Sequence, residues 1–222
     1  MYGNPRIYNG DGIYNGGGVN EGEFISYNEP GLPVTYRQVN YIINNNHNST
    51  DFFKIPALVS NYDYYEFNIA VKNIIDDGYE IFSGVTSGNL RRIQAFYNPK
   101  YSNVNQRFVL DIGGVNSIAL EPRKLRNTIT FFNPYAYVNN VQYNCNGTVY
   151  NDIDSIFWGI PKPPQTNYIK FGNIKIVDRV TMQKKLNAIP CVDPDGLIGF
   201  FDTVSQNFTS LAQGDNDLLL VE

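Results

Sequence analysis

Hydrophobic and polar residues alternate in short runs through most of the chain after residue 38, and a period of two is typical of β-strands that bury one face. Residues 64–72 show this best, because Tyr65, Phe67, Ile69 and Val71 share one face while the residues between them are largely polar. Further runs of strand length, separated by turn-forming residues, are 41–43, 52–55, 81–84, 93–97, 108–112, 117–120, 127–132, 135–138, 141–143 and 155–159. Many short strands at this spacing predict an all-β sandwich of two sheets.

The end of the chain contains the most regular pattern. Residues 172–178 alternate, with Lys175 on the face opposite two isoleucines. Residues 186–191 are mostly apolar, and we interpret Pro190 as the end of that strand because proline cannot donate to a sheet ladder. The sequence Asp-Pro-Asp-Gly at 193–196 predicts a tight turn into one more strand. Other turns are predicted at residues 77–78, 139–140 and 146–147.

The same C-terminal residues carry a resemblance to a known family. The string IKIVD, followed by NAIPCVDPDGLIGFFDTVSQNF, resembles the C-terminal signature of concanavalin A-like (laminin-G-type) jelly-roll domains of bacterial and phage surface proteins. The resemblance covers residues 40–215 and implies a two-sheet antiparallel jelly-roll sandwich. No laminin-G calcium pair maps onto aspartates of this chain, so we assign no metal and no cofactor.

Residues 1–38 differ from the rest, because they hold eight of the 19 glycines, three prolines and no lysine. We therefore divide the chain into an extended arm, 1–38, and a jelly-roll domain, 39–222. Such an arm cannot bury enough surface to fold alone, and a flexible linker is one interpretation. Rigid aromatic residues spaced by glycine favour another, an arm that binds pockets on a partner. The candidate contacts are Tyr2, Tyr8, Tyr14, Phe24 and Tyr27.

Composition narrows the function classes. Only 17% of the residues are charged, against about 25% in an ordinary soluble domain. Asparagine fills much of the polar surface instead, which favours a surface that meets other protein, and an asparagine-rich source proteome is the alternative explanation. Aromatic residues make up 14%, and tyrosine suits interfaces at which one end of the side chain stays wet. The net charge of −4 argues against nucleic-acid binding. No run approaches the roughly 20 apolar residues of a membrane span, and residues 1–30 lack an apolar signal segment, so we expect synthesis in the cytoplasm.

The sequence contains no complete catalytic motif of a glycoside hydrolase or of a histidine-based triad. Asp152 and Asp154 form the nearest match to the acid pair of sandwich-fold endoglucanases, but the third acid of that pattern is absent. His47 is the only histidine and lies among asparagines, so no histidine-based triad or metal site can be assembled. We expect no enzyme. Cys145 and Cys191 are expected to be free, buried thiols.

Carbohydrate binding fits the composition better, because sugar sites combine an aromatic platform with Asn and Asp side chains. Asparagine-rich loops place four tyrosines as candidates for such a platform, namely Tyr97, Tyr101, Tyr135 and Tyr137. The general abundance of tyrosine favours the alternative that these residues fill core or interface positions.

The combination of a jelly roll, a glycine- and tyrosine-rich arm and no signal segment resembles virion proteins of tailed bacteriophages, in particular head fibres, capsid decorations or tail fibres of crAss-like phages. That resemblance implies a virion protein that contacts other virion proteins through residues 1–38, forms homo-oligomers and displays its domain for adhesion to host glycans. Two alternatives stay open. One is a bacterial surface lectin-like carbohydrate-binding module, and the other is a glycoside hydrolase with two facing carboxyl groups about 5–10 Å apart.

Overall fold

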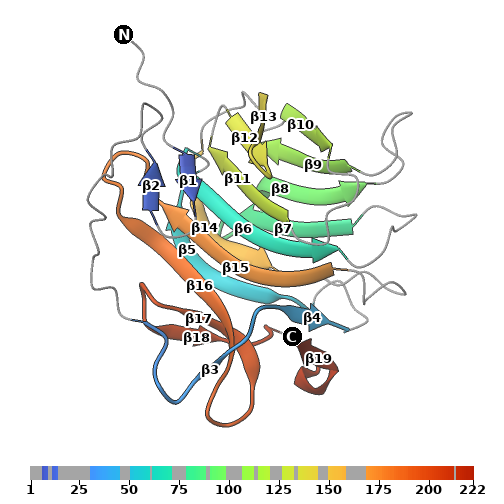
Figure 1. The fold of residues 1–222 in the computed structure, drawn as a ribbon, viewed down its shortest axis with the longest axis vertical. Coiled ribbons are helices and arrows are strands. Elements are labelled where there is room, and N and C mark those ends of the chain that lie inside the picture. Colours follow the sequence, from blue (N-terminus) through green and yellow to red (C-terminus); the bar gives the residue numbers. More distant parts are fainter. Residues whose placement is uncertain are drawn as a thin grey trace.

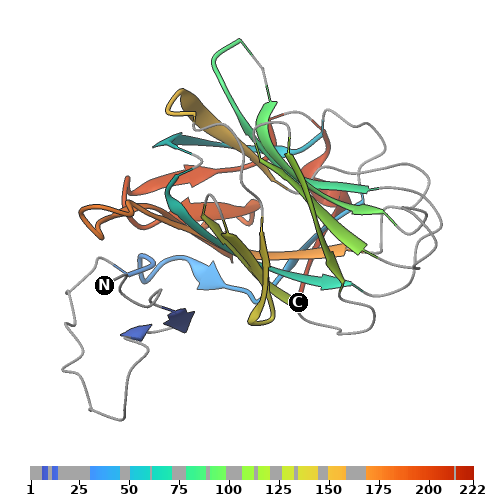
Figure 2. The same ribbon diagram turned by 90° about the horizontal axis from the view of Figure 1, so that it is seen from above.

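The computed structural model describes residues 7–9, 12–14, 31–45, 51–60, 62–71, 79–88, 91–98, 107–112, 115–120, 127–132, 135–144, 150–158, 169–212 and 214–222. Their regular structure is almost entirely β-strand. Two antiparallel sheets stack face to face (Figures 1 and 2), and the strands at residues 7–9 and 12–14 form a separate two-stranded sheet. The smaller sheet has six strands, in the order β10 (Val115–Leu120), β9 (Arg107–Ile112), β8 (Arg91–Asn98), β7 (Tyr79–Val85), β14 (Ile153–Trp158) and β5 (Phe53–Val59).

The larger sheet has 11 strands. Its main path is β13 (Val141–Asn144), β12 (Tyr135–Val138), β11 (Asn127–Phe132), β6 (Tyr64–Val71), β15 (Ile169–Val177), β16 (Lys184–Val192), β17 (Ile198–Asp202) and β18 (Asn207–Thr209). Off this path, β4 (Ile42–Asn44) pairs with β15 and with β19 (Leu219–Val221), and β3 (Arg37–Gln38) pairs with β16. A 3₁₀ turn, Asn216–Leu218, precedes β19.

The chain passes repeatedly from one sheet to the other. Strands β5, β6 and β7 alternate between the sheets, and so do β13, β14 and β15. All inter-strand pairs in both sheets are antiparallel among the described residues. This arrangement confirms the predicted fold class, a two-sheet antiparallel jelly-roll sandwich.

The core lies between the two sheets and is rich in aromatic residues. Phe67 of β6 stacks on Phe82 of β7 with ring centroids 5.2 Å apart, and Trp158 of β14 contacts both rings edge-on. The predicted inner face of β6 is confirmed, because Tyr65, Phe67 and Ile69 are fully buried. Each buried aromatic side chain contributes about 2–3 kcal/mol through the area it removes from water, so these contacts hold the sheets together.

The predicted strand end at Pro190 is wrong, because β16 continues through it to Val192. The carbonyl of Pro190 accepts a hydrogen bond from the Val39 N–H at 3.0 Å. The N–H that proline lacks would point to the same side of the strand as this carbonyl. Pairing with β15 on that side has already ended at Ala188, so the missing N–H breaks no hydrogen bond with β15. The outermost strand β5 likewise runs through Pro56, beyond the predicted end at residue 55.

Two predicted turns are confirmed by backbone geometry. Asn139 and Asn140 have φ of 48° and 71° between β12 and β13, as a tight hairpin requires. The turn at 193–196 has Gly196 at φ 87°, and the Asp193 carboxylate accepts the N–H groups of Asp195 and Leu197. The turns predicted at 77–78 and 146–147 lie outside the described residues.

Within the first 30 residues, the structure describes only β1 (Ile7–Asn9) and β2 (Gly12–Tyr14), which pair with each other, so the division into arm and domain stays a prediction. Cys191 is a buried free cysteine, and burial raises the pKa of its thiol to about 11. Cys145 and His47 lie outside the described residues. No helix in the described part of the chain is long and apolar enough to span a membrane.

Candidate functional site

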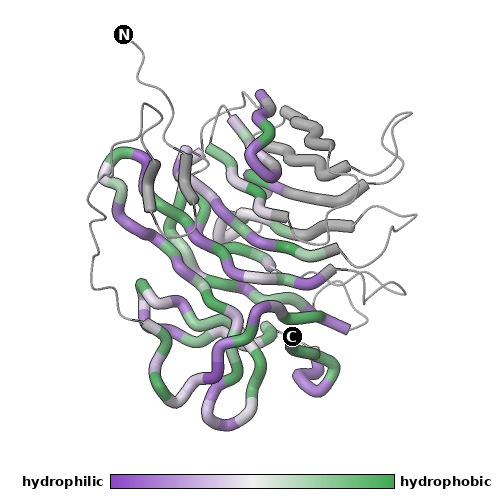
Figure 3. The backbone as a smooth tube through the Cα atoms, viewed as in Figure 1, coloured by the Kyte–Doolittle hydropathy of each residue, from purple (hydrophilic) through white to green (hydrophobic). Residues whose placement is uncertain are grey.

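The outer face of the larger sheet carries a continuous set of polar and aromatic side chains. The period of two that buries Tyr65 and Phe67 necessarily turns Tyr64, Glu66 and Asn68 outward on the same strand. Figure 3 shows the resulting alternation of hydrophilic and hydrophobic positions along the strands of this sheet. These outward polar and aromatic side chains therefore form the candidate binding surface.

Strand register places four of these residues in one row across the sheet. Thr130 of β11 lies opposite Glu66 of β6, Glu66 lies opposite Lys175 of β15, and Lys175 lies opposite Asn187 of β16. Directly opposite residues in antiparallel strands have Cβ atoms about 5 Å apart, so their side chains interact. Although this is the outer face, Glu66 and Lys175 are each only 8% exposed.

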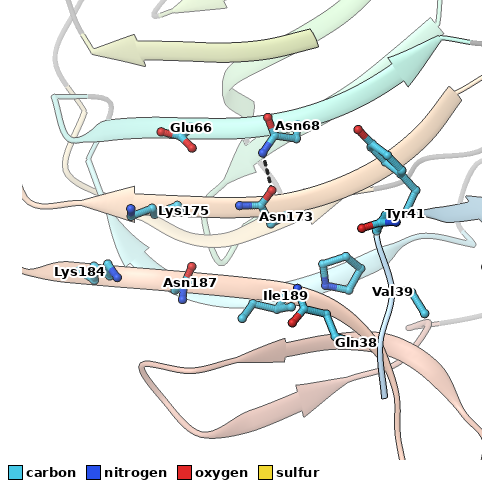
Figure 4. A pocket seen from close by; sticks show the side chains of 12 residues that line it. Gln38, Val39, Tyr41, Glu66, Asn68, Asn173, Lys175, Lys184, Asn187 and Ile189 are labelled. Atoms are coloured by element: carbon cyan, nitrogen blue, oxygen red, sulfur yellow. Dashed lines mark hydrogen bonds between the residues drawn. The ribbon is translucent and has the colours of Figure 1, made fainter. Parts of the chain in front are cut away.

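A second polar row runs beside the first. The Thr128 hydroxyl donates to the Asn68 side-chain oxygen at 2.8 Å, and the Asn68 amide in turn donates to the side-chain oxygen of Asn173. The three residues come from β11, β6 and β15, and Figure 4 shows the Asn68–Asn173 bond among the side chains that line a groove. Because each amide is held by its neighbour, this ladder presents donors and acceptors in a fixed arrangement.

A β-bulge in β15 brings Asn173 into this ladder. The register with β6 shifts between Phe171 and Ile174, and the carbonyl of Gly172 accepts the Trp158 indole N–H from the core at 3.3 Å. A Cβ atom at position 172 would lie 2.9 Å from the backbone oxygen of Asn68, so only glycine fits this approach. The bulge therefore links core packing to the placement of the polar ladder.

The segment of residues 38–41 forms one wall over these rows. The N–H groups of Asn40 and Tyr41 both donate to the backbone carbonyl of Glu222, at 2.7 and 3.2 Å, so Glu222 holds the wall in place. The groove between this wall and the rows has a volume of about 430 Å³. It is lined by Gln38, Val39, Asn40, Tyr41, Glu66, Asn68, Asn173, Lys175, Lys184, Asn187, Ile189 and Pro190 (Figure 4).

Glu66 is the electrostatic centre of the groove. Its Oε2 atom is buried and has no hydrogen-bond partner in the structure. Burial raises the pKa of this carboxyl group above its ordinary value, and the nearby Lys175 ammonium opposes the shift only in part. A buried carboxylate oxygen without a donor is unfavourable for the free protein, and a ligand that supplies a donor removes that cost.

Asn187 is held rigidly at the other side of the groove. Its backbone N–H donates to the Asp202 carboxylate at 2.9 Å, and its side-chain amide N–H donates to the Thr203 hydroxyl at 2.8 Å. These bonds direct the amide nitrogen toward β17, and Figure 4 shows the amide oxygen on the side of β15. The groove therefore has a fixed acceptor opposite Lys175.

The structure brings two of the four predicted glycan-binding tyrosines to the same face as the groove. Tyr137 lies opposite Thr130, and Tyr135 lies opposite Phe132, so both point outward from β12 and are half-buried. By strand spacing, Tyr137 stands two strands, or about 10 Å, from Glu66. Tyr97 belongs to β8 of the smaller sheet, and Tyr101 lies outside the described residues.

The predicted arm contacts are only partly described. Tyr8 lies on β1, opposite Ile13, and Tyr14 lies on β2, opposite Ile7. Tyr2, Phe24 and Tyr27 lie outside the described residues. The role of these five aromatic residues in partner binding therefore stays a prediction.

The acid pair considered for hydrolysis is not in the groove. Asp152 precedes β14 of the smaller sheet, and its carboxylate pairs with Arg92 at 2.5 Å, which lowers its pKa. Asp154 accepts a hydrogen bond from the Ser155 hydroxyl at 2.7 Å. The carboxyl group that does line the groove, Glu66, was missed in the sequence analysis because a polar residue at an outward strand position looks solvated until its neighbours are known.

Comparison with known proteins yields similarity at the level of fold. No protein-family model and no curated protein sequence matches the chain. A native heptameric SAP-like pentraxin from Limulus polyphemus superposes with a TM-score of 0.46 at 11% identity, over 64% of this chain and 76% of the pentraxin.

Two structures of Trypanosoma rangeli sialidase match over 68% of this chain. One is a complex with the inhibitor DANA (TM-score 0.37, 11% identity) and the other a covalent intermediate with 2,3-difluorosialic acid (TM-score 0.38, 10% identity). The match spans 33% of the length of each sialidase chain. At these identities the likeness concerns fold alone.

Proposed function

We propose that this chain is a virion structural protein whose jelly-roll domain binds glycans through the groove on the outer face of its larger sheet. The observation that carries the glycan half is the groove itself, with the unpartnered Oε2 of Glu66 beside the Asn68–Asn173 ladder. Its volume of about 430 Å³ falls in the range of roughly 300–1,000 Å³ that is typical of small-molecule sites.

Sugars match this chemistry. Each sugar ring carries several adjacent hydroxyl groups, and every hydroxyl both donates and accepts hydrogen bonds. The groove offers a carboxylate acceptor, amides that do both, and the ammonium group of Lys184. Tyr135 and Tyr137 extend the same face with aromatic surface for a longer chain of sugars. A weak contact of this kind gains strength when many copies are displayed together.

We propose binding rather than hydrolysis. Glycoside hydrolysis needs two carboxyl groups on opposite sides of the scissile bond. Glu66 is the one carboxyl group among the described residues that line the groove, and its neighbour across the strands is Lys175. This arrangement supports the binding of a sugar, and it lacks the second carboxyl group that glycoside hydrolysis would require.

The virion half of the proposal rests on the resemblance of the C-terminal signature to phage surface proteins and on the composition of residues 1–38. In this proposal the arm attaches the protein to other virion proteins, copies associate as homo-oligomers, and the sandwich is displayed to host glycans. Aromatic anchors spaced by glycine suit an extended segment that lies along a partner.

Two measurements test the two halves separately. The purified chain is screened on a glycan array with Asn173→Ala as the groove variant, and we expect binding that this substitution reduces. Deletion of residues 1–38 is scored for incorporation into particles, with circular dichroism as the control for folding. An array that stays blank would overturn the glycan half, and normal incorporation without the arm would overturn the attachment half.

A further inference from the structure

The groove contains one buried group whose hydrogen bonding is incomplete. Glu66 is 8% exposed, and its Oε2 atom has no partner, whereas the amides of the adjacent row are bonded to one another. A buried polar atom without a partner is uncommon in native proteins and points to something that completes it. A carboxylate oxygen is completed by a donor, that is, by a hydroxyl, an amide N–H or an ammonium group.

The charged residues near Glu66 determine which of these ligand groups is favoured as the donor. Lys175 lies directly opposite Glu66, and Lys184 lines the same groove from β16. A ligand ammonium would bring a third cation to one carboxylate and meet the repulsion of two lysines. At Oε2 itself, an ionised ligand carboxylate has no proton to donate and would be repelled by Glu66. A hydroxyl is the donor that adds no charge.

Resting on the proposed glycan-binding function, we infer that the groove is specific for neutral saccharides and that a sugar hydroxyl donates to Oε2 of Glu66. An adjacent hydroxyl lies within reach of the Asn68–Asn173 ladder, because Glu66 and Asn68 are outward neighbours on one strand, about 7 Å apart. The ligand class is therefore a neutral sugar with neighbouring hydroxyl groups, rather than an acidic or an amino sugar.

This contact predicts proton linkage with a definite sign. A donor to the carboxylate stabilises its ionised form, so the ligand binds the deprotonated state of Glu66 more tightly. Affinity should rise as the pH rises through the pKa of Glu66 in the free protein, which burial places above the ordinary value. The titratable group directly opposite Glu66 is Lys175 of β15, and Lys184 of β16 lines the same groove.

The experiment measures binding of the full chain to immobilised neutral oligosaccharides of glucose, mannose and galactose, to polygalacturonate and sialyllactose, and to chitosan oligomers. We expect binding to the neutral class, weakened about tenfold to a hundredfold by Glu66→Gln, because a charge-assisted hydrogen bond is lost. Asp154→Asn is the matched control, since it removes the same charge from the smaller sheet and keeps an acceptor for Ser155.

The outcomes separate the inference from the proposed function. Binding of only acidic or only amino sugars would overturn the ligand class and leave glycan binding intact. Neutral-sugar binding that Glu66→Gln leaves unchanged would overturn the role of Glu66. No binding in any class by the folded chain would overturn the glycan-binding function together with the inference. The pH readout is independent, because Glu66→Gln should abolish the rise in affinity with pH.

Discussion

Two buried carboxyl groups lie close together in the larger sheet, one just before β6 and the other within it, and they differ in their hydrogen bonding. Asp63, just before β6, accepts the Ser60 backbone N–H at 2.7 Å and the Lys185 ammonium at 2.9 Å. Glu66, three residues later, has an oxygen with no partner, and the Lys175 ammonium only partly offsets its burial. Both side chains are nearly inaccessible to water, at 4% and 8% exposure.

The contrast separates a carboxylate that builds the fold from one that, in our proposal, a ligand completes. Asp63 ties the turn before β6 to β16 through Lys185, and Lys185 also pairs with Asp178 at 3.2 Å. Glu66 makes no comparable tie, and its raised pKa means that its ionised form weakens the fold. Sites that hold an unsatisfied group at the expense of stability are typical of function.

The largest effect is expected at Asp63. Asp63→Ala leaves the buried Ser60 N–H without an acceptor and removes one of the two carboxylates that pair with the half-buried Lys185, so we expect a loss of about 2–3 kcal/mol in the free energy of unfolding. Urea denaturation followed by tryptophan fluorescence measures it, since Trp158 lies in the core. Asp63→Asn keeps an acceptor for Ser60 and should lose less. Equal stability of Asp63→Ala and the parent would contradict the assignment of Asp63 to the fold.

Glu66→Gln should act in the opposite direction. At neutral pH the substitution removes a buried charge that the fold disfavours, so we expect a gain of about 1–2 kcal/mol. The sign depends on pH, because the folded protein binds the proton of Glu66 more tightly than the unfolded chain does. In acid, the parent and the variant should therefore have the same free energy of unfolding. The parent should become less stable than the variant as the pH rises through the raised pKa of Glu66.

The same denaturation experiment, repeated from pH 4 to pH 8, checks this prediction for Glu66. A Glu66→Gln variant that is less stable than the parent throughout would mean that the electrostatic attraction of Lys175 outweighs the cost of burial. Asp154→Asn again serves as the control for a lost negative charge, since Asp154 lies on the other sheet.

The smallest effect is expected at Asp178. Its carboxylate accepts the backbone N–H groups of Thr181 and Val180, both at 2.8 Å, and together with Lys185 they lower its pKa to about 2. The stability that this provides is present above the ordinary pKa of 3.8 and is lost as the pH falls toward 2. We expect Asp178→Asn to lose about 0.5–1 kcal/mol at pH 7 and much less at pH 2, where about half of the Asp178 carboxyl groups in the folded protein are protonated. Thermal unfolding at both values tests this, and a pH-independent loss would refute it.

Much of the fold could be predicted because a period of two is a local property. The alternation in residues 64–72 correctly predicted the inner face of β6, and the asparagine pair at 139–140 correctly predicted a turn. The strand end at Pro190 was wrong, because whether a proline interrupts a strand depends on what lies beside its missing N–H. That neighbour, Val39, is far away in the sequence.

The candidate site was predicted only in part. Tyr135 and Tyr137 were singled out by their type and loop context, and they lie on the face of the groove. Lys175 was noted only for its place on the outer face of its strand, and Glu66 was one of the polar positions between the apolar ones in 64–72, because nothing local shows that the strands are neighbours with this register. A one-residue difference in register would have placed a different residue opposite Glu66.

By itself, the sequence determined which side chains point inward, where the chain turns, and that two sheets must pack to cover the apolar faces. These follow from side-chain period and backbone preference, which act within a few residues. Only the tertiary structure decided that Glu66 is buried. Pairing of β6 with β15, the bulge at Gly172, and the wall held by the backbone of Glu222 join distant parts of the chain, and they convert a surface row of polar residues into a groove. Burial depends on such long-range contacts, so local pattern cannot specify it.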